Sequence, residues 1–283
     1  MNASTGFSFL APAKLNISLK VFGKRADGYH NIYSVMVPVS LYDEVTLEEA
    51  DSGILVESDD PAVPVDGGNT CHRAAALFME WAGAPKGVRI RLRKRIPAES
   101  GLGGGSSDAA ATFKGMMALT GRNPPPETLL GMAARVGADV PFFTLGGPAV
   151  AEGIGERLTP VEWRVPFFTL IVKPPFGLST REGYARLRRG TGDNPPDAVA
   201  PAFRDWEDLV PAVSNDFEAA WGDTRPEIGE IKRELLSAGA RAAGLSGSGS
   251  AVFGLFGDAK AAHDALGMLS RNGGRRIFVA HNI

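Results

Sequence analysis

The sequence predicts an α+β protein with two domains. The chain has 283 residues, and a single hydrophobic core rarely grows beyond about 250 to 300 residues. Apolar and polar residues alternate over 32–47, which indicates a strand, whereas the spacing of apolar residues over 74–81 indicates a helix. From Pro160 onward further helices and strands alternate along the chain. We therefore expect a first domain at 1–159 and a second domain at 160–283.

Two stretches are predicted to be loops. Residues 51–68 are acidic and rich in proline and glycine, which predicts a loop or a short hairpin, and residues 191–201 are polar and contain prolines. Arginines alternate with apolar residues over 88–95, which predicts a strand with one solvated face. A nucleic-acid-binding stripe is the alternative for these arginines, but the chain as a whole is not basic.

The composition excludes several classes of protein. The apolar fraction is 44%, the charged fraction is 22% and the mean hydropathy is -0.04, as in ordinary soluble globular proteins. A net charge of -2 provides no broad attraction for nucleic acid. No uninterrupted apolar run approaches the roughly 18 residues that a membrane span needs. We expect a small-molecule ligand, with neither nucleic acid nor a membrane as a partner.

The presence of a single cysteine, Cys71, indicates the kind of cellular compartment in which the protein works. One cysteine cannot form an internal disulfide or a cysteine-based zinc site, which fits a reducing environment. The first basic residue is Lys14, so the positively charged start of a secretory signal is missing. We expect a cytoplasmic protein that is a monomer or a weak homodimer.

A glycine-rich segment between a predicted strand and a predicted helix at 106–119 is the main functional signal. Glycines let the backbone approach a bulky anion, and the first turn of the helix contributes N–H groups and a positive dipole end. The segment therefore predicts a phosphate-binding loop, and a plain glycine linker capped by Ser106 is the alternative. The predicted contact residues are Pro97, Ala98, Glu99, Ser100, Gly101, Leu102, Gly103, Gly104, Gly105, Ser106 and Ser107.

Two common phosphate-binding motifs do not fit this segment. The Walker pattern requires a lysine between its last glycine and a Ser or Thr, but Ser106 and Ser107 follow Gly105 directly. The dinucleotide fingerprint requires a glycine three positions after Gly103, where Ser106 stands. The loop belongs to another class.

Three segments, in this order, resemble motifs of the GHMP kinase superfamily: Pro-Ala-Lys-Leu-Asn at 12–16, residues 97–110, and Leu-Ser-Gly-Ser-Gly-Ser at 245–250. The resemblance implies a two-domain fold with a ribosomal-protein-like α/β N-terminal lobe, a ferredoxin-like C-terminal lobe and an active site in the cleft between them. It implies ATP as the phosphoryl donor, and ATP chemistry implies Mg²⁺. Ser107 and Asp108 are close enough to the loop to contact the ion, and the sequence does not decide between them. The segment 246–250 is expected beside the loop, although a tight turn into a strand would also explain it.

Two further segments narrow the resemblance. Residues 23–30, Gly-Lys-Arg-Ala-Asp-Gly-Tyr-His, and residues 137–143 resemble one group within the superfamily. For that group the acceptor is a cytidine diphosphate derivative of methylerythritol, phosphorylated on its 2-hydroxyl in the non-mevalonate isoprenoid pathway. A homoserine or mevalonate type kinase is the alternative enzyme, and a non-catalytic binding protein is the alternative outside enzymes.

Phosphoryl transfer requires positive groups around the moving oxygens and a carboxylate that orients or deprotonates the attacking hydroxyl. Asp139 and Lys14 are the candidates, and a nearby lysine would keep Asp139 ionised. The alternatives are a helix-terminal role for Asp139 and a solvated strand position for Lys14.

The candidate substrate-binding residues are Tyr29, His30, Tyr184 and Asn16. Tyr29 is expected to stack on the cytosine, His30 to hydrogen-bond its edge, and Tyr184 resembles the second aromatic face. Asn16 is expected to hydrogen-bond the substrate hydroxyls. Local packing, loop exposure or an ordinary strand position would also explain these four residues. Asn69 resembles an asparagine near the nucleotide, although the residues after it depart from the family pattern.

Overall fold

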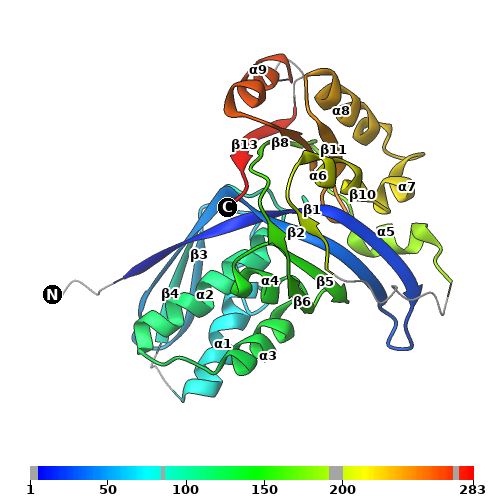
Figure 1. Ribbon diagram of the computed structural model, residues 1–283. Helices are drawn as coiled ribbons and strands as arrows, with labels where there is room; N and C mark the ends of the chain where they lie inside the picture. Colours follow the sequence, from blue (N-terminus) through cyan, green and yellow to red (C-terminus); the bar gives the residue numbers. More distant parts are fainter. Residues whose placement is uncertain (1–5, 84–86, 191–199, 270–273) are drawn as a thin grey trace. The chain divides into compact units, whose positions relative to one another are not determined.

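The computed structural model describes residues 6–83, 87–190, 200–269 and 274–283 (Figure 1). Contacts between residues divide the chain into two compact units, and neither is continuous in sequence. The first unit comprises residues 1–13, 42–98 and 103–146, and the second comprises residues 14–41, 99–102 and 147–283. Two long strands, β1 (Phe7–Lys24) and β2 (His30–Glu49), contribute residues to both units. The predicted domains 1–159 and 160–283 stay a prediction.

The first unit contains part of a sheet covered by helices. The second half of β2 pairs antiparallel with β4 (Gly87–Arg93), and β4 pairs in parallel with β3 (Gly53–Ser58). The helices of this unit pack against one another (Figure 1). The helices are α1 (Thr70–Ala82), α2 (Gly104–Thr120), α3 (Pro126–Val136) and α4 (Val140–Leu145).

Packing in this unit depends on a glycine in the middle of α2. A Cβ on Gly115 would lie 2.3 Å from Cδ1 of Leu47, so only glycine lets the helix approach β2 this closely. Phe78 on α1 and Phe113 on α2 are fully buried in the same unit. The period-two pattern therefore places Leu47 in the core, as the sequence predicts.

The prediction of a loop or short hairpin at 51–68 is wrong for one segment. Gly53–Ser58 forms strand β3, and it runs parallel to β4 because α1 lies between the two strands in sequence and supplies the crossover that a parallel pair needs. The arginine face of β4 is confirmed as a solvated face. Arg89 pairs with Glu48 at 3.1 Å, and Arg91 pairs with Glu57 at 3.0 Å.

The second unit contains a four-stranded antiparallel sheet with the order β11-β12-β8-β13. Along the chain β8 (Phe168–Lys173), α8 (Pro226–Ser237), β11 (Ala242–Leu245), β12 (Val252–Phe256), α9 (Ala259–Leu269) and β13 (Arg276–His281) follow in this order. A βαββαβ order with this strand arrangement is the ferredoxin-like fold that the family resemblance implies. Helices α8 and α9 pack on the sheet, and Ile231, Leu235 and Ala262 are fully buried there.

The second unit contains further strands and helices. The beginning of β2 pairs with β5, and β5 pairs with β6, while the end of β1 pairs with β10. The bounds are β5 (Ala149–Gly153), β6 (Arg157–Pro160), β7 (Glu162–Trp163), α5 (Thr180–Leu187), β9 (Ala202–Phe203), α6 (Trp206–Ala212), β10 (Ser214–Asn215) and α7 (Phe217–Trp221). Most of the predicted loop at 191–201 lies outside the described residues. Within the described part of the chain, no helix combines the length and apolar character that crossing a membrane requires.

Two neighbouring leucines on α8 test the packing of the second unit. Leu235 is 0% exposed and Leu236 is 46% exposed. Leu235→Ala should lower the free energy of unfolding by about 2 to 5 kcal/mol, because it removes buried apolar surface and leaves a cavity. Leu236→Ala is the matched control and should change it by less than about 0.5 kcal/mol. Urea unfolding followed by circular dichroism measures both, and equal losses would contradict this orientation of α8.

Candidate active site

Three segments that lie far apart in the sequence meet in the second unit. The backbone N–H of Lys14 donates to the carbonyl of Leu102 at 3.0 Å. The backbone N–H of Asn16 donates to Oγ of Ser246 at 3.3 Å, and this hydroxyl in turn donates to the carbonyl of Gly101 at 3.0 Å. The segments 14–16, 99–102 and 246–250 are thus joined by direct hydrogen bonds.

The contact between Gly101 and Ser246 is too close for any side chain. A Cβ on Gly101 would lie 2.0 Å from the carbonyl oxygen of Ser246, and Gly101 has a φ of +77°. The backbone N–H of Ala251 also donates to the carbonyl of Ser100 at 3.0 Å. The structure therefore places the segment 246–250 directly against the glycine-rich loop, as expected.

The glycine-rich loop leads into the first turn of α2. Gly103 occupies the N-cap position with a φ of +75° and provides no side-chain cap. Ser107 follows in the first turn, and its hydroxyl is buried without a hydrogen-bond partner. A helix start without a side-chain cap is suited to an anion. Ser106 lies inside the helix, so the alternative of a linker capped by Ser106 is wrong.

The residues of the loop divide into anchoring and accessible positions. Pro97, Ser100, Leu102 and Ser107 are buried, so their side chains hold the loop in place. The accessible or half-buried positions are Ala98, Glu99, Gly101, Gly103, Gly104, Gly105 and Ser106. Thr70 ties the end of the loop to α1, because its hydroxyl donates to the carbonyl of Gly105 at 2.7 Å.

Lys14 is a buried residue of β1, so the alternative of a solvated strand position is wrong. Its exposed fraction is 3%, and its ammonium group donates to Oδ1 of Asn16. The amide of Asn16 donates to the hydroxyl of Ser34 at 2.7 Å, and that hydroxyl donates to the carbonyl of Ser18 at 2.6 Å. This chain of donors orients the Asn16 oxygen toward Lys14. Asn16 therefore positions the lysine, and its contact with substrate hydroxyls stays a prediction.

Asp139 lies in the first unit, between α3 and α4. It occupies the N-cap position of α4 with a φ of -85°, and its side chain makes no capping hydrogen bond. The residue is half-buried. Asp139 therefore holds the helix-terminal position that the alternative expects, and its catalytic role stays a prediction. Its pairing with Lys14 stays a prediction.

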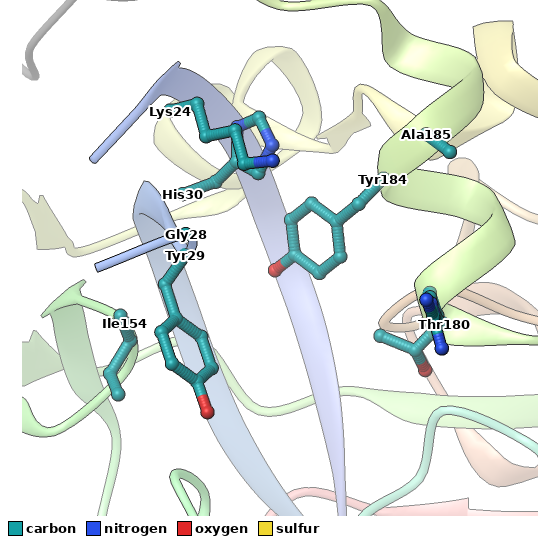
Figure 2. Close-up of a pocket in the computed structure, with 9 residues that line it drawn as sticks. Lys24, Gly28, Tyr29, His30, Ile154, Thr180, Tyr184 and Ala185 are labelled. Atoms are coloured by element: carbon teal, nitrogen blue, oxygen red, sulfur yellow. The ribbon is translucent and has the colours of Figure 1, made fainter. Parts of the chain in front are cut away.

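An aromatic pocket of about 560 Å³ lies in the second unit (Figure 2). The rings of His30 and Tyr184 are stacked, with centroids 5.2 Å apart and planes at 13°. Figure 2 shows Tyr184 reaching from α5 toward Tyr29 and His30. The structure thus brings together the three predicted aromatic residues. The lining residues are Lys24, Gly28, Tyr29, His30, Ile154, Thr180, Arg181, Tyr184 and Ala185.

The histidine of this pocket has a defined tautomer. Nδ1 of His30 lies 2.9 Å from the carbonyl of Phe22, and a carbonyl can only accept, so Nδ1 carries the proton. Nε2 of the neutral ring is then a hydrogen-bond acceptor. Tyr29 is 60% exposed, which leaves its ring accessible to a planar ligand.

Helix α5 holds Tyr184 in place through contacts on two sides. A Cβ on Gly183 would lie 2.9 Å from the ring of Phe217, so the helix approaches α7 closely, and Tyr184 packs edge-on against the same ring at 5.0 Å. Thr180 hydrogen-bonds the hydroxyl of Ser248 at 2.7 Å. Tyr184 therefore both packs on the core and lines the pocket.

Comparisons with known proteins agree with this arrangement. Residues 69–147 match the family model of the GHMP kinases N terminal domain, and residues 199–274 match that of the GHMP kinases C terminal. A 4-diphosphocytidyl-2-C-methyl-D-erythritol kinase of Geobacter sp. (strain M21) is 41% identical over 94% of this chain and 95% of its own length. One of Syntrophotalea carbinolica is 40% identical over 98% of this chain and 99% of its own length.

The chain belongs to the GHMP kinase family.

Solved structures support the same family. A crystal structure of 4-(cytidine 5'-diphospho)-2C-methyl-D-erythritol kinase superposes with a TM-score of 0.81, at 36% identity over 98% of this chain and 99% of that one. A homoserine kinase from Cytophaga hutchinsonii has a TM-score of 0.73 at 20% identity and covers 100% of this chain and 96% of its own, which shows the shared fold. Within the family, this GHMP kinase groups with the 4-diphosphocytidyl-2-C-methyl-D-erythritol kinases.

Asn69 of this GHMP kinase is the N-cap of α1. Its Oδ1 accepts from the N–H of Cys71 at 2.7 Å, and its Nδ2 donates to the carbonyl of Pro64 at 2.6 Å. The residue is 4% exposed. The structure thus gives Asn69 a capping role, and its nucleotide contact stays a prediction.

Sequence reasoning missed a buried charge cluster in the first unit, formed by Asp43, Lys94 and Asp108. Lys94 Nζ pairs with Asp43 at 2.5 Å and also with Asp108. Burial raises the pKa of the Asp108 carboxyl to about 7, although Lys94 acts to lower it, and Asp43 raises it further. Oδ1 of Asp108 is buried and has no hydrogen-bond partner.

A signal for this cluster was present in β2. The inward-facing apolar residues of the strand are Val35, Val37, Val39, Leu41, Val45 and Leu47, and Asp43 interrupts that series at an inward position. A carboxylate at such a position must find a buried partner. The identity of that partner, Lys94, could not be read from the sequence because it stands in a run of arginines that face solvent.

The close contact at Gly101 can be tested against a glycine with a similar backbone conformation. Gly121 has a φ of +65°, and the space that a methyl group would occupy there is open, so Gly121→Ala should cost about 1 to 2 kcal/mol for the left-handed conformation alone. Gly101→Ala should lower stability by more, because its methyl group would collide with the carbonyl of Ser246. Thermal unfolding compares the two variants, and equal costs would contradict the contact between the segments.

Proposed function

We propose that this kinase transfers the γ-phosphoryl group of ATP to the 2-hydroxyl of 4-diphosphocytidyl-2-C-methyl-D-erythritol, a step of the non-mevalonate isoprenoid precursor pathway. The observation that carries the proposal is the pocket of Tyr29, His30 and Tyr184 in the unit that also holds Lys14. The similarity to relatives named for this activity supports it. A homoserine or mevalonate acceptor has no planar base and would not need these rings.

The pocket matches the chemistry of a cytosine. Nε2 of His30 is an acceptor and fits the exocyclic amino group of the base. The accessible ring of Tyr29 offers a stacking surface, and Tyr184 limits the pocket on the side of α5. Lys24 and Arg181 also line it and supply positive charge for a diphosphate. One ligand that carries a base and a diphosphate uses all of these groups.

ATP binds in this proposal through the glycine-rich loop. The uncapped start of α2 supplies backbone N–H groups for a phosphate, and Gly101 and Gly103 place no side chain in the loop. The loop therefore holds the donor by backbone N–H groups rather than by a Walker lysine. Lys14 is joined to the loop through Leu102, which places its positive charge on the same framework.

Mg²⁺ would be held mainly by phosphate oxygens and water, as is usual for this ion. Among the described residues there is no group of three or more His, Cys, Asp or Glu side chains that could hold a metal. The hydroxyl of Ser107 at the start of α2 is buried without a partner and fits as a single protein ligand. Bound Mg²⁺ would neutralise charge on the transferring phosphoryl group.

Asp139 is the proposed general base and Lys14 the proposed electrostatic partner. The carboxylate accepts the proton of the attacking hydroxyl, and the ammonium group stabilises negative charge that develops on the oxygens around the transferring phosphorus. Asn16 holds the lysine in orientation through its side-chain oxygen. The burial of Lys14 supports its role, because a solvated lysine would be screened by water.

We also propose a cytoplasmic enzyme that is a monomer or a weak homodimer. Cys71 is a free, buried cysteine, and burial raises the pKa of its thiol, so it has the properties of an inert core residue. This fits a reducing compartment.

The acceptor can be tested with purified protein, ATP and Mg²⁺. We expect ADP formation to depend on 4-diphosphocytidyl-2-C-methyl-D-erythritol and to stay at background with homoserine or mevalonate, because only the first acceptor carries a cytosine. A coupled assay measures ADP release. Turnover with mevalonate or homoserine in place of the cytidine compound would overturn the proposal.

A pair of Tyr184 variants separates the role of the ring from that of the hydroxyl in the same assay. Tyr184→Ala should raise the KM for the acceptor about 5- to 150-fold, the size of one lost stacking contact, because it removes the ring that stacks on His30 and bounds the pocket. Tyr184→Phe keeps the ring and should stay near the parent value.

The catalytic assignments predict a loss of kcat without a loss of fold. Asp139→Asn and Lys14→Met should each lower kcat by about 10²- to 10⁴-fold, because they remove the base and the charge. Lys260→Met and Asp264→Asn are matched controls, since these residues form an exposed ion pair on α9 at 2.6 Å. Steady-state kinetics and circular dichroism measure both effects. Near-normal turnover in either variant would remove that residue from the mechanism.

A further inference from the structure

We propose that the buried cluster of Asp43, Lys94 and Asp108 positions the glycine-rich loop for nucleotide binding by tying together the segments where the loop begins and ends. None of the three lines the aromatic pocket, so we assign them a positioning role that acts through the loop. The inference rests on the proposed function in one respect, namely that the loop binds ATP.

The first part of the cluster holds the beginning of the loop. Strand β4 ends at Arg93, so the next backbone N–H groups have left the ladder. Oδ1 of Asp43 accepts from the N–H of Arg95 at 2.5 Å and from the N–H of Ile96 at 2.8 Å. The Asp43 carboxylate thus accepts the hydrogen bonds that a neighbouring strand would otherwise accept, as far as Ile96, the residue before Pro97.

The second part of the cluster holds the end of the loop. Asp108 lies in the first turns of α2, and the ammonium group of Lys94 bridges it to Asp43. The two ends also touch directly. A Cβ on Gly104 would lie 3.0 Å from Cγ2 of Ile96 and 3.4 Å from Oδ2 of Asp43. The buried charges and Gly104 therefore hold the two ends of the segment 97–103 close together.

The burial of these charges is the physical reason to assign them a positioning role. The side chains of Asp43, Asp108 and Lys94 are 0%, 3% and 8% exposed. Buried ion pairs recover little net stability, because desolvation offsets their attraction, and apolar side chains of similar volume often stabilise a protein as well or better. Directed hydrogen bonds to two successive N–H groups, however, impose a geometry that apolar packing cannot impose.

Lys94 has a second effect at this end of the helix. Asp108 lies close to the start of α2, where a phosphate group is proposed to bind, and an unpaired carboxylate there would repel it. The ammonium group is shared by Asp108 and Asp43, so it offsets only part of the negative charge of the two carboxylates. The cluster therefore supports the phosphate site by geometry.

The test uses isosteric variants of the two carboxylates. Asp43→Asn and Asp108→Asn keep side-chain size and remove the charge that faces Lys94. Glu48→Gln is the matched control, because Glu48 is also a carboxylate of β2 that pairs with cations of β4, at 3.1 Å to Arg89 and 2.8 Å to Arg91. The measurements are the Kd of a non-hydrolysable ATP analogue by calorimetry, the KM values for ATP and acceptor, and hydrogen exchange of the peptide 95–108. All are made well below the unfolding midpoint of each variant.

We expect both variants to raise the Kd of the analogue and the KM for ATP about tenfold, the effect of one lost charged hydrogen bond. The KM for the acceptor should stay within about twofold, because the aromatic pocket is unchanged. The peptide 95–108 should exchange faster, whereas strand β8 and the Glu48→Gln control should match the parent protein. If the cluster only stabilised the fold, the two variants would lower the unfolding midpoint without raising the KM for ATP more than the KM for the acceptor.

Three results would overturn the inference. They are an unchanged Kd and KM for ATP in a folded Asp108→Asn variant, an equal rise in both KM values, and a parent protein that does not bind the analogue. If Asp43→Asn fails to fold, Asp108→Asn decides alone, since Asp108 does not hold the two N–H groups before the loop. The parent protein could bind the analogue without phosphorylating the cytidine compound. That result would overturn the proposed acceptor, and the Kd values would still decide whether the cluster positions the loop.

Discussion

The close backbone contact between Gly101 and Ser246 is the constraint on which the candidate site of the second unit depends. With 2.0 Å between a hypothetical Cβ on Gly101 and the Ser246 carbonyl oxygen, the two segments can meet only through glycine backbone. The Ser246 hydroxyl then accepts from the N–H of Asn16 and donates to the carbonyl of Gly101. One serine therefore sets the position of the loop and of the strand that carries Lys14.

The same glycine segment connects this framework to the aromatic pocket. Ser248 hydrogen-bonds Thr180 at the start of α5 at 2.7 Å, and its carbonyl accepts from the indole N–H of Trp221 at 2.9 Å. Tyr184 is carried by the same helix as Thr180. The aromatic pocket and the glycine-rich loop thus share one short segment of chain, 246–250. A displacement of that segment would move both features together, so their relative position depends on it.

Much of the fold and part of the site could be predicted from the sequence. The alternation in β2 predicted its buried face, and the glycine pattern predicted the loop at the start of α2. The strand β3 was missed, because a short six-residue strand in an acidic, proline-rich stretch has little local signal and depends on β4 for its pairing. The cluster of Asp43, Lys94 and Asp108 was missed for a similar reason, since a lysine within an arginine run gives no sign that it is buried.

The sequence by itself determined the residue types and the local periodicity: which strands have an apolar face, which glycines permit a positive φ, and which motifs occur in order. Only the tertiary structure decided which of these groups are partners. Asn16 and Ser246 are 230 positions apart, yet the N–H of Asn16 donates to the Ser246 hydroxyl. The physical reason is that burial and hydrogen bonding are properties of the space around a side chain, and distant segments fill that space.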